Sequence, residues 1–405
     1  MTTVTDQVRE IEAKSLLQVY RRLPIVLVRG DGSKVFDAEG RAYLDLLSGL
    51  GVTSLGHAHP GLADALAEQA RVLVHTSNLY FHPLQGQVAN RLARLSGLPR
   101  TFFCNSGTEA VEACLKFARR YWHSKGETRT QIVAFDRSFH GRTFGSLSVT
   151  SDLHYRTPFE PLVPGVTFVP PMDPDALRTA VTPETAAIIL EPIQGEGGVR
   201  PIPQATADAV QALCAETGTL LIADEVQCGL GRTGLPFFAP ALGLRPDLMA
   251  LGKALGAGFP VGAALLSQAV AQTVEFGDHG STYGGNLLAC RAALVFLDAL
   301  EGGLLERVQA AGKRFEDGLR SLAEVHSVIG EIRGAGLIWG LDVKQTAAER
   351  MVEAATKCGL LINRTDGTVI RLLPPLTITD AEIDDALVRL DDAFRGAIEP
   401  GTTGE

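Results

Sequence analysis

The chain has 405 residues, of which 45% are hydrophobic and 20% charged, and this length accommodates one large or two medium-sized domains with a substantial core. An excess of acidic over basic residues, 46 against 37, gives a net charge of −9 and excludes a broad basic surface for nucleic acid or an anionic membrane. The six cysteines are scattered without a C-x-x-C pair, which disfavours a disulfide framework and a cysteine zinc site and indicates a reducing cytoplasm.

Two segments bear on export and membrane insertion. The N-terminal residues carry Asp6 and Glu10 and lack an apolar stretch, so we expect no signal peptide. Residues 248–266 contain a single charge, Lys253, but four glycines and a proline interrupt any spanning helix. This segment is predicted to be a buried strand–turn–strand, and no membrane association is expected.

Short apolar runs alternate with longer helical patterns along the first three quarters of the chain, which indicates an α/β fold with a mostly parallel sheet. A helix is predicted over 108–122, capped by Ser106 or Thr108, and another over 206–216, ending at Gly218. The predicted strands are 101–104, 132–135, 166–169, 186–190, 220–223, 249–251 and 261–266.

After Gly303 the pattern changes to a charged helix over 304–323 followed by short strands, which predicts a smaller α+β unit. Those strands are 328–332, 337–343 and 369–372. Residues 1–50 contain strand-like runs at 25–29 and 43–46 but no obvious sheet of their own. The predicted organisation is an N-terminal segment packing with the small domain (1–58), a large cofactor-binding domain (59–302), a C-terminal small domain (303–400) and a disordered tail (401–405).

Asp224 and Lys253 lie where a ligand site is expected. Asp224 ends the strand predicted over 220–223, and Lys253 follows the strand predicted over 249–251, so both lie at the carboxyl ends of strands. Alone, each is better explained as a loop carboxylate or a solvent-reaching lysine. Together they fit pyridoxal 5′-phosphate, which needs a lysine for a Schiff base and an acid beside its pyridine nitrogen.

A phosphate site is predicted at Asn105-Ser106-Gly107-Thr108, which follows a strand and opens a helix. Backbone N–H groups and the helix dipole at such a position suit a dianionic phosphate. The same residues are also common as a purely structural cap. The phosphate site, the acid and the lysine nevertheless occur in the order that the cofactor needs.

Six sequence blocks resemble the class III (ornithine-type) aminotransferases, and the resemblance covers essentially the whole chain. It implies fold type I of the pyridoxal-phosphate enzymes, with a mostly parallel seven-stranded sheet in the large domain and a smaller α+β domain built from both termini. The blocks are Phe-Cys-Asn-Ser-Gly-Thr-Glu-Ala (103–110), Phe-His-Gly-Arg-Thr (139–143), Glu-Pro-Ile-Gln-Gly-Glu-Gly-Gly (191–198), Asp-Glu-Val-Gln (224–227), Gly-Lys-Ala-Leu-Gly (252–256) and Gly-Ser-Thr-Tyr-Gly-Gly-Asn (280–286).

The resemblance implies that Lys253 and Asp224 are catalytic. Lys253 would hold the cofactor as a Schiff base and then move the proton between substrate and cofactor. Asp224 would keep the cofactor's ring nitrogen protonated. Thr282 would reach the phosphate in the neighbouring subunit, which implies a homodimer. The other residues implied to bind the cofactor are Ser106, Gly107 and Thr108 at the phosphate, Phe139 on the ring face, Val226, and Gln227 near the phenolic oxygen.

Within the class, the block Arg371-Leu-Leu-Pro-Pro-Leu and the short chain are most similar to the acetylornithine-type members. Arginine forks bind carboxylates well, and the resemblance implies that Arg142 binds the acetylornithine α-carboxylate or the distal carboxylate of 2-oxoglutarate. Arg371 would bind the α-carboxylate of glutamate or 2-oxoglutarate. Glu196 would pair with Arg371 for the ω-amino substrate and release it for glutamate. Ser281 would lie beside the substrate.

Tyr80 and Phe81 bear on which ω-amine is accepted. Ornithine aminotransferases have a substrate-binding tyrosine in this segment, and alignment places Phe81 at that point with Tyr80 adjacent. A phenyl ring cannot hydrogen-bond a free α-amine, so an acylated amine is expected. Ping-pong transfer from acetylornithine to 2-oxoglutarate, in arginine biosynthesis, is the predicted function. The alternative is a related ω-aminotransferase acting on ornithine, succinylornithine, 4-aminobutyrate or carrier-bound aminoadipate semialdehyde.

Two motifs suggest other functions less well. The glycines of 229–234 match G-x-G-x-x-G, but no helix follows, so a dinucleotide site is not expected and the glycines are interpreted as a loop over the cofactor. His57 and His59 are a poor ligand set, so a structural turn and no metal are expected. Lys116 is predicted to pair with Glu112 at i, i+4 spacing.

Two rival classes stay open at this point. One is another reaction on the same fold, such as an aminomutase or racemase, which the Arg371 and Glu196 pair argues against. The other is a binding protein without catalysis, for which loss of Lys253 or Asp224 would be the sign.

Overall fold

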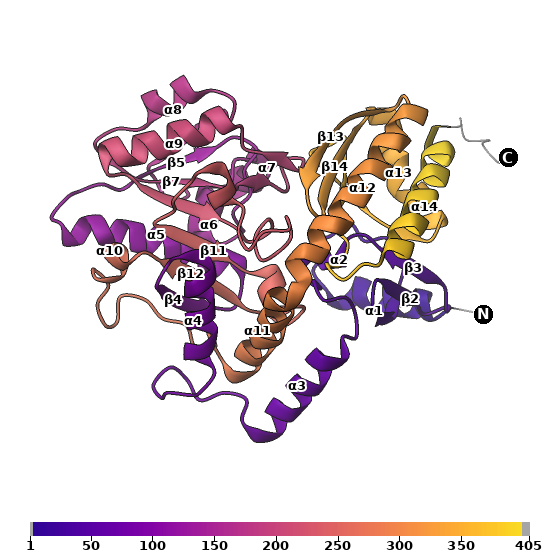
Figure 1. The fold of residues 1–405 in the computed structure, drawn as a ribbon, viewed down its shortest axis with the longest axis horizontal. Coiled ribbons are helices and arrows are strands. Elements are labelled where there is room, and N and C mark those ends of the chain that lie inside the picture. Colours follow the sequence, from indigo (N-terminus) through magenta and orange to yellow (C-terminus); the bar gives the residue numbers. More distant parts are fainter. Residues whose placement is uncertain (1–2, 399–405) are drawn as a thin grey trace.

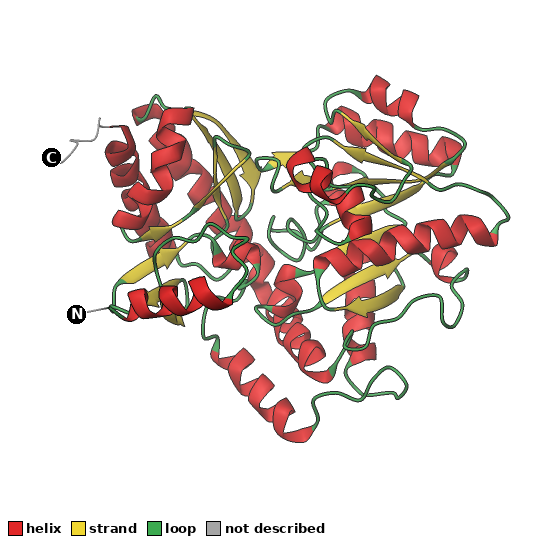
Figure 2. Cartoon of the chain, turned by 180° about the vertical axis from the view of Figure 1, so that it is seen from behind, coloured by secondary structure: helices red, strands yellow, loops and turns green. Residues whose placement is uncertain are grey.

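The computed structural model describes residues 3–398, in which a larger part with one wide sheet adjoins a smaller part with two four-stranded sheets (Figure 1). The smaller part contains both ends of the described chain, so the N-terminal strands lie beside the C-terminal helices (Figure 2). One large apolar cluster runs through both parts and joins them. The tail predicted over 401–405 lies outside the described residues.

The wide sheet has seven strands in the order β4-β12-β11-β10-β7-β5-β6. Neighbouring strands are parallel from β11 to β6, whereas β12 is antiparallel to both of its neighbours. All seven predicted strands are confirmed to within one residue at each end. They are β4 (Arg100–Cys104), β5 (Gln131–Phe135), β6 (Val166–Val169), β7 (Thr185–Leu190), β10 (Leu220–Asp224), β11 (Leu248–Leu251) and β12 (Gly262–Leu266).

The sheet is covered by helices on both faces because its strands are apolar on both faces. In β10, Leu220 and Ile222 pack into one apolar cluster, and Leu221 and Ala223 pack into the other. This is the two-residue alternation of a strand. The first cluster contains α5 (Gly107–Ser124), and the second contains α8 (Pro174–Ala180), α9 (Gln204–Thr217) and α11 (Leu287–Ala299). The helices predicted over 108–122 and 206–216 are therefore confirmed.

The membrane-like stretch 248–266 is a buried hairpin, as predicted. It consists of β11, a 3-10 turn over Lys253–Gly256, and β12 paired antiparallel to β11. Among residues 3–398, no helix is both long enough and apolar enough to cross a membrane.

The C-terminal sheet is antiparallel in the order β13-β14-β17-β16 and is packed against helices, which confirms the predicted α+β unit. Its strands are β13 (Ile329–Ala335), β14 (Ile338–Val343), β16 (Asn363–Thr365) and β17 (Val369–Leu372). Its helices are α12 (Leu305–Val325), α13 (Gln345–Lys357) and α14 (Asp380–Ile398).

The N-terminal residues do form a sheet, so the expectation that residues 1–50 have none of their own is wrong. After α1 (Val4–Ser15), the strands β1 (Leu27–Asp31), β2 (Lys34–Asp37) and β3 (Ala42–Asp45) form an antiparallel meander. Strand β15 (Leu360–Leu361) then pairs in parallel with β3. The sheet was missed because β2 is short and β15 comes from the far end of the chain. Through β15, this sheet includes a strand from the C-terminal part of the chain.

The remaining elements are short or flank the wide sheet. They are α2 (Ser48–Gly51), α3 (Pro60–Val72), α4 (Gln85–Ser96), α6 (Phe144–Ser148), α7 (Leu153–Arg156), α10 (Gln268–Ala271), β8 (Ile193–Gln194) and β9 (Arg200–Pro201). Single turns cover Thr157–Phe159, Ala239–Leu242 and Leu300–Leu304.

Candidate active site

A pocket of about 240 Å³ opens at the carboxyl ends of β5, β7, β10 and β11, the edge where open α/β sheets bind ligands. It brings together most of the residues that the sequence singled out for the cofactor. Its lining residues are Gly107, Thr108, Phe139, His140, Gly141, Arg142, Glu191, Glu196, Asp224, Val226, Gln227 and Lys253.

Asp224 is fixed at the end of β10 by contacts to both carboxylate oxygens. The side chain is 5% exposed, His140 Nδ1 donates to its Oδ2 at 2.7 Å, and the backbone N–H of Val226 donates to its Oδ1 at 3.1 Å. Sequence analysis gave His140 no role. The available signal was a histidine inside the Phe-His-Gly-Arg-Thr block, just beyond a strand that ends at the same edge. Its Nε2 is buried and has no hydrogen-bond partner among the described residues.

Glu191 is a second buried acid that sequence analysis missed. It follows β7, and its carboxylate accepts the backbone N–H of Phe139 at 2.9 Å and that of Gly195 at 3.0 Å. Burial raises the pKa of Glu191 to about 7. The nearby His140 opposes this rise, and the Asp224 carboxylate adds to it. Glu191 therefore anchors the backbone of the aromatic residue predicted to stack on the cofactor.

Glu225, directly after Asp224, fixes the backbone at Phe238 and Ala239, outside the pocket. Its Oε1 accepts the backbone N–H groups of Phe238 and Ala239 at 2.7 and 2.6 Å. Burial raises the pKa of Glu225 to about 7. This carboxyl closes the loop that carries Val226 and Gln227 into the pocket.

Lys253 enters the pocket from the first residue of the 3-10 turn after β11, with a backbone φ of 40°. Burial lowers the pKa of its amine, an effect that the Glu196 carboxylate opposes. A lowered pKa increases the fraction of neutral amine, which is the form that attacks a carbonyl and accepts a proton.

The N-terminus of α5 opens into the same pocket through Gly107 and Thr108. A Cβ on Gly107 would lie 2.6 Å from Val226 Cγ1, so only glycine brings these two loops together. The Thr108 hydroxyl is 2.6 Å from Ser146 Oγ, which ties the helix start to α6. Ser106 is the cap of α5, its Oγ accepting the backbone N–H of Glu109 at 3.3 Å.

Arg371 is fully buried on β17 and contacts Glu196, which lines the pocket. Its Nη1 lies 2.6 Å from Glu196 Oε1 and donates to Gln227 Oε1 at 3.3 Å, while its Nε donates to Asn363 Oδ1 at 3.3 Å. Burial alone would raise the pKa of Glu196, but the Arg371 guanidinium outweighs it and the pKa lies below its ordinary value.

Arg142 lies at the outer side of the pocket, with its guanidinium carbon 3.4 Å from the centre of the Tyr155 ring. Within residues 3–398 its side chain makes no ion pair. This stacked, solvent-facing guanidinium keeps its donors available for a carboxylate.

Comparison with known proteins agrees with this geometry. Residues 17–394 match the family described as aminotransferase class-III. The chain is a class III aminotransferase.

The similarity to known members extends over nearly the whole aminotransferase. The acetylornithine aminotransferase of Methanocaldococcus jannaschii is 44% identical over 95% of this chain and 97% of its own, and that of Aquifex aeolicus is 46% identical over 92% and 97%. Among solved structures, the ornithine aminotransferase of Toxoplasma gondii ME49 superposes with a TM-score of 0.93 at 33% identity, covering 97% of this chain and 96% of that one. The N-acetylornithine aminotransferase of Stenotrophomonas maltophilia K279a gives 0.83 at 35%, covering 96% and 98%.

Class III aminotransferases are pyridoxal-phosphate enzymes of fold type I, and the pocket of this aminotransferase fits that group. A buried acid, a lysine of lowered pKa and a helix N-terminus converge in one pocket. These match the three needs of the cofactor, namely an acid at the ring nitrogen, an amine for the aldehyde and N–H donors for the phosphate.

Six residues predicted near the substrate or phosphate do not line the pocket of their own chain: Ser106 and Arg371 lie just behind it, and the other four lie elsewhere. Tyr80 is 71% exposed and Phe81 fully exposed. Thr282 is also exposed, and Ser281 Oγ accepts the Gly284 N–H at 3.0 Å. Their roles stay predictions.

The remaining motifs of the aminotransferase are structural. His57 Nε2 contacts Asp45 Oδ2 at 2.7 Å, and the His59 ring caps α3, as a structural turn predicts. No cluster that could hold a metal occurs among residues 3–398. The 229–234 glycines do not lie over the pocket as predicted, because Gly231 and Gly234 pack against Leu300 and Gln309.

The predicted pair between Lys116 and Glu112 is wrong. Lys116 Nζ is 2.8 Å from His279 Nδ1, and the Glu112 carboxylate accepts the backbone N–H of Gly145 at 2.7 Å. Tertiary partners outcompete the helical neighbour because an exposed i, i+4 ion pair contributes only about 0.3–0.5 kcal/mol.

Proposed function

We propose that this aminotransferase moves the δ-amino group of N2-acetylornithine to 2-oxoglutarate in a ping-pong reaction, giving N-acetylglutamate semialdehyde and glutamate within arginine biosynthesis. The observation that carries the proposal is the contact of 2.6 Å between Arg371, which is fully buried, and Glu196, which is partly exposed and lines the pocket. A transaminase that accepts both a side-chain amine and an α-amine needs an arginine that is neutralised when the first is bound and free to bind a carboxylate when the second is bound. Curated relatives from archaea, bacteria and a plant named acetylornithine aminotransferase support the choice of substrate.

The two half-reactions use the arginines differently. With the ω-amine bound, Glu196 neutralises Arg371, and Arg142 at the outer side of the pocket binds the substrate α-carboxylate. With glutamate or 2-oxoglutarate bound, Glu196 moves away, Arg371 binds the α-carboxylate and Arg142 binds the distal one. Arg371 stays in place during this exchange because Gln227 and Asn363 also hold it.

Pyridoxal phosphate supplies an electron sink for the carbon that loses its proton. Lys253 Nζ would hold the cofactor through its aldehyde and, once free, would carry the proton of the substrate carbon. The Asp224 carboxylate, ordered by His140, would keep the ring nitrogen protonated. Phe139, anchored by Glu191, would pack on the ring, and the N–H groups of Gly107 and Thr108 would hold the phosphate.

We also infer a homodimer in which Thr282 and the segment around Tyr80 complete the partner's pocket. Thr282 is exposed here, as that role requires. Large apolar side chains on the two segments are exposed as well, which is typical of an interaction surface. They are Val72, Leu73, Val74, Leu79, Tyr80, Phe81, Phe276 and Tyr283. The six cysteines are free, as the expected cytoplasmic location requires.

A single-turnover titration tests the substrate. The absorbance of the bound cofactor is followed after mixing the purified holoenzyme with acetylornithine, ornithine, succinylornithine or 4-aminobutyrate. Fast bleaching by acetylornithine and slow bleaching by ornithine are expected. Preference for another of these amines would keep the chemistry and overturn the proposed substrate. The ornithine alternative is included because the ornithine aminotransferase of Toxoplasma gondii ME49 superposes so closely.

A further inference from the structure

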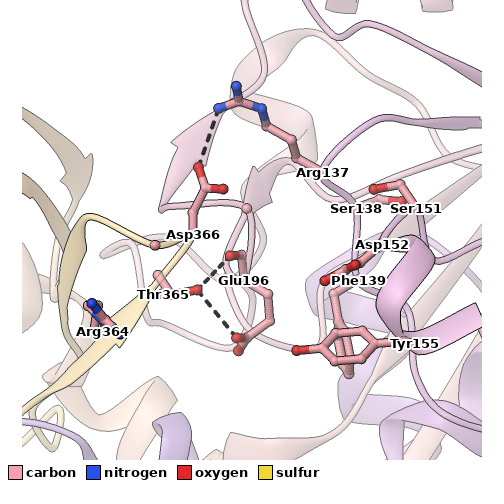
Figure 3. A pocket seen from close by; sticks show the side chains of 12 residues that line it. Arg137, Ser138, Phe139, Ser151, Asp152, Tyr155, Glu196, Arg364, Thr365 and Asp366 are labelled. Atoms are coloured by element: carbon pink, nitrogen blue, oxygen red, sulfur yellow. Dashed lines mark hydrogen bonds and ion pairs between the residues drawn. The ribbon is translucent and has the colours of Figure 1, made fainter. Parts of the chain in front are cut away.

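The hairpin of β16 and β17 belongs to the small part of the molecule, and its tip lies beside the active site (Figure 3). Its tip lines a second pocket of about 550 Å³ that shares Phe139 and Glu196 with the cofactor pocket. Figure 3 shows the Thr365 hydroxyl directly beside Glu196, with dashed lines to two of its oxygens, and Asp366 turned toward Arg137.

Both carboxylate oxygens of Glu196 face side chains of this one hairpin. Oε1 is 2.6 Å from Arg371 on β17, and Oε2 is 3.4 Å from the hydroxyl of Thr365 on β16. The same hydroxyl donates to the main-chain carbonyl of Glu196 at 2.5 Å. Thr365 is buried, so water does not compete for these contacts. The hydroxyl therefore fixes the backbone from which the carboxylate swings and contacts the oxygen that Arg371 leaves free.

The tip of the hairpin is itself held against the larger part. Asp366 Oδ2 lies 3.3 Å from Arg137 Nη1 and 3.6 Å from Arg200 Nη2. The turn is tight, with φ of 44° at Asp366 and 74° at Gly367. Thr365 is thus presented to Glu196 at a set position.

We propose that Thr365 is a positioning residue that holds Glu196 on Arg371 and thereby sets the balance between the two half-reactions of this enzyme. The inference rests on the proposed function, in which Glu196 must leave Arg371 before an α-carboxylate binds. Leaving means losing the contact to the Thr365 hydroxyl as well. Removing that hydroxyl raises the population in which Arg371 is exposed, and an apparent affinity rises in proportion to the population that can bind.

The variant Thr365→Val keeps the shape of the side chain and removes its hydroxyl. We expect the KM for glutamate and 2-oxoglutarate to fall relative to that for acetylornithine by up to roughly threefold, because the hydroxyl's one proton goes to the Glu196 carbonyl at 2.5 Å and its contact to Oε2 at 3.4 Å is weaker than a full hydrogen bond. Thr365→Ser retains the hydroxyl and should keep the wild-type ratio. Thr368→Val is the matched control, because Thr368 lies on the same hairpin and its hydroxyl donates to Asp342 at 2.9 Å, away from Glu196. Equal changes in both half-reactions, or a Thr365→Ser variant that behaves like Thr365→Val, would overturn the proposal.

Calorimetric titration with glutarate supplies a readout that needs no turnover. This dicarboxylate has no amine or keto group and should bind the holoenzyme through Arg371 and Arg142. We expect its Kd to fall in Thr365→Val by the same factor as the KM, and not in Thr368→Val. Unchanged glutarate binding would refute the positioning role even where acetylornithine is the substrate. Tighter binding, with acetylornithine rejected, would uphold the positioning role and refute only the proposed substrate.

Discussion

The cofactor end of the active site and its substrate end differ in how deeply their residues are buried. At the cofactor end, Asp224, His140 and Glu191 are buried at the edge of a parallel sheet and fix one another and the surrounding backbone. At the substrate end, Arg142 faces solvent and Tyr80 is exposed. The buried acids and Lys253 are thus supplied by one domain, whereas substrate choice, in the function we propose, depends on the small part and a second subunit.

Lys253→Ala should have the largest effect, because no other amine lines the pocket. Turnover should fall by at least about 10⁴-fold, since both Schiff-base formation and proton transfer depend on this residue. Single-turnover kinetics with a fixed amine measure the loss, and Lys125→Ala, on an exposed turn after α5, is the control. An active Lys253→Ala variant would refute the assignment of the whole cofactor end.

Asp224→Asn should lower turnover by roughly 10²–10⁴-fold, because a neutral amide cannot hold a proton on the cofactor's ring nitrogen. The fold should survive, since the amide keeps the shape of the side chain and one contact to His140. Circular dichroism checks the fold, and the rate of cofactor bleaching checks the chemistry. A loss confined to KM would place Asp224 in substrate binding instead.

Arg371→Ala should separate the two half-reactions. The glutamate half-reaction should lose roughly 10²-fold in kcat/KM, as expected for a lost charge-assisted pair, while the acetylornithine half-reaction changes much less. The measurement is bleaching and recovery of the cofactor absorbance with each substrate alone. Equal losses in both would contradict the exchange between Glu196 and Arg371.

Glu225→Gln tests a carboxyl whose pKa is raised by burial to about 7. The folded state holds this proton up to about pH 7, whereas the unfolded chain loses it near pH 4.3, so the group makes stability fall as pH rises between these values. The variant should lack this part of the slope, a difference of roughly 1–3 kcal/mol across the interval. Urea unfolding of both proteins from pH 5 to pH 8 measures it, and parallel slopes would contradict the prediction.

Thr282→Ala should have the smallest effect, a loss of roughly three- to tenfold in cofactor retention, because one neutral hydrogen bond to the phosphate is removed. Dialysis followed by absorbance measures retention, and analytical ultracentrifugation checks that the dimer is intact. Thr273→Ala is a suitable control, since that hydroxyl donates to the Val270 carbonyl. No difference between the two variants would count against a completed site across subunits.

The residues that sequence analysis located are those whose place follows from chain order. Asp224 and Lys253 end β10 and follow β11, and adjacent parallel strands bring such residues together by topology alone. The helix start at Ser106 follows from capping chemistry in the same local way.

The residues that it missed depend on contacts between distant segments. Glu191 anchors a backbone N–H 52 residues away, and Thr365 contacts Glu196 across the two parts of the molecule. No pattern near either residue in the sequence predicts its partner. Glu112 is the converse case, since its local neighbour Lys116 predicts a pair that the fold replaces with the start of α6.

The pairing of β3 with β15 sets an order of assembly during synthesis. Residue 44 pairs with residue 360, so the first sheet of the chain stays incomplete until almost all of the protein has left the ribosome. The wide sheet, by contrast, is complete once residue 266 has emerged. Contacts of such long sequence separation form late and slowly. In a nascent chain the edge of β3 therefore stays unpaired until β15 has been made.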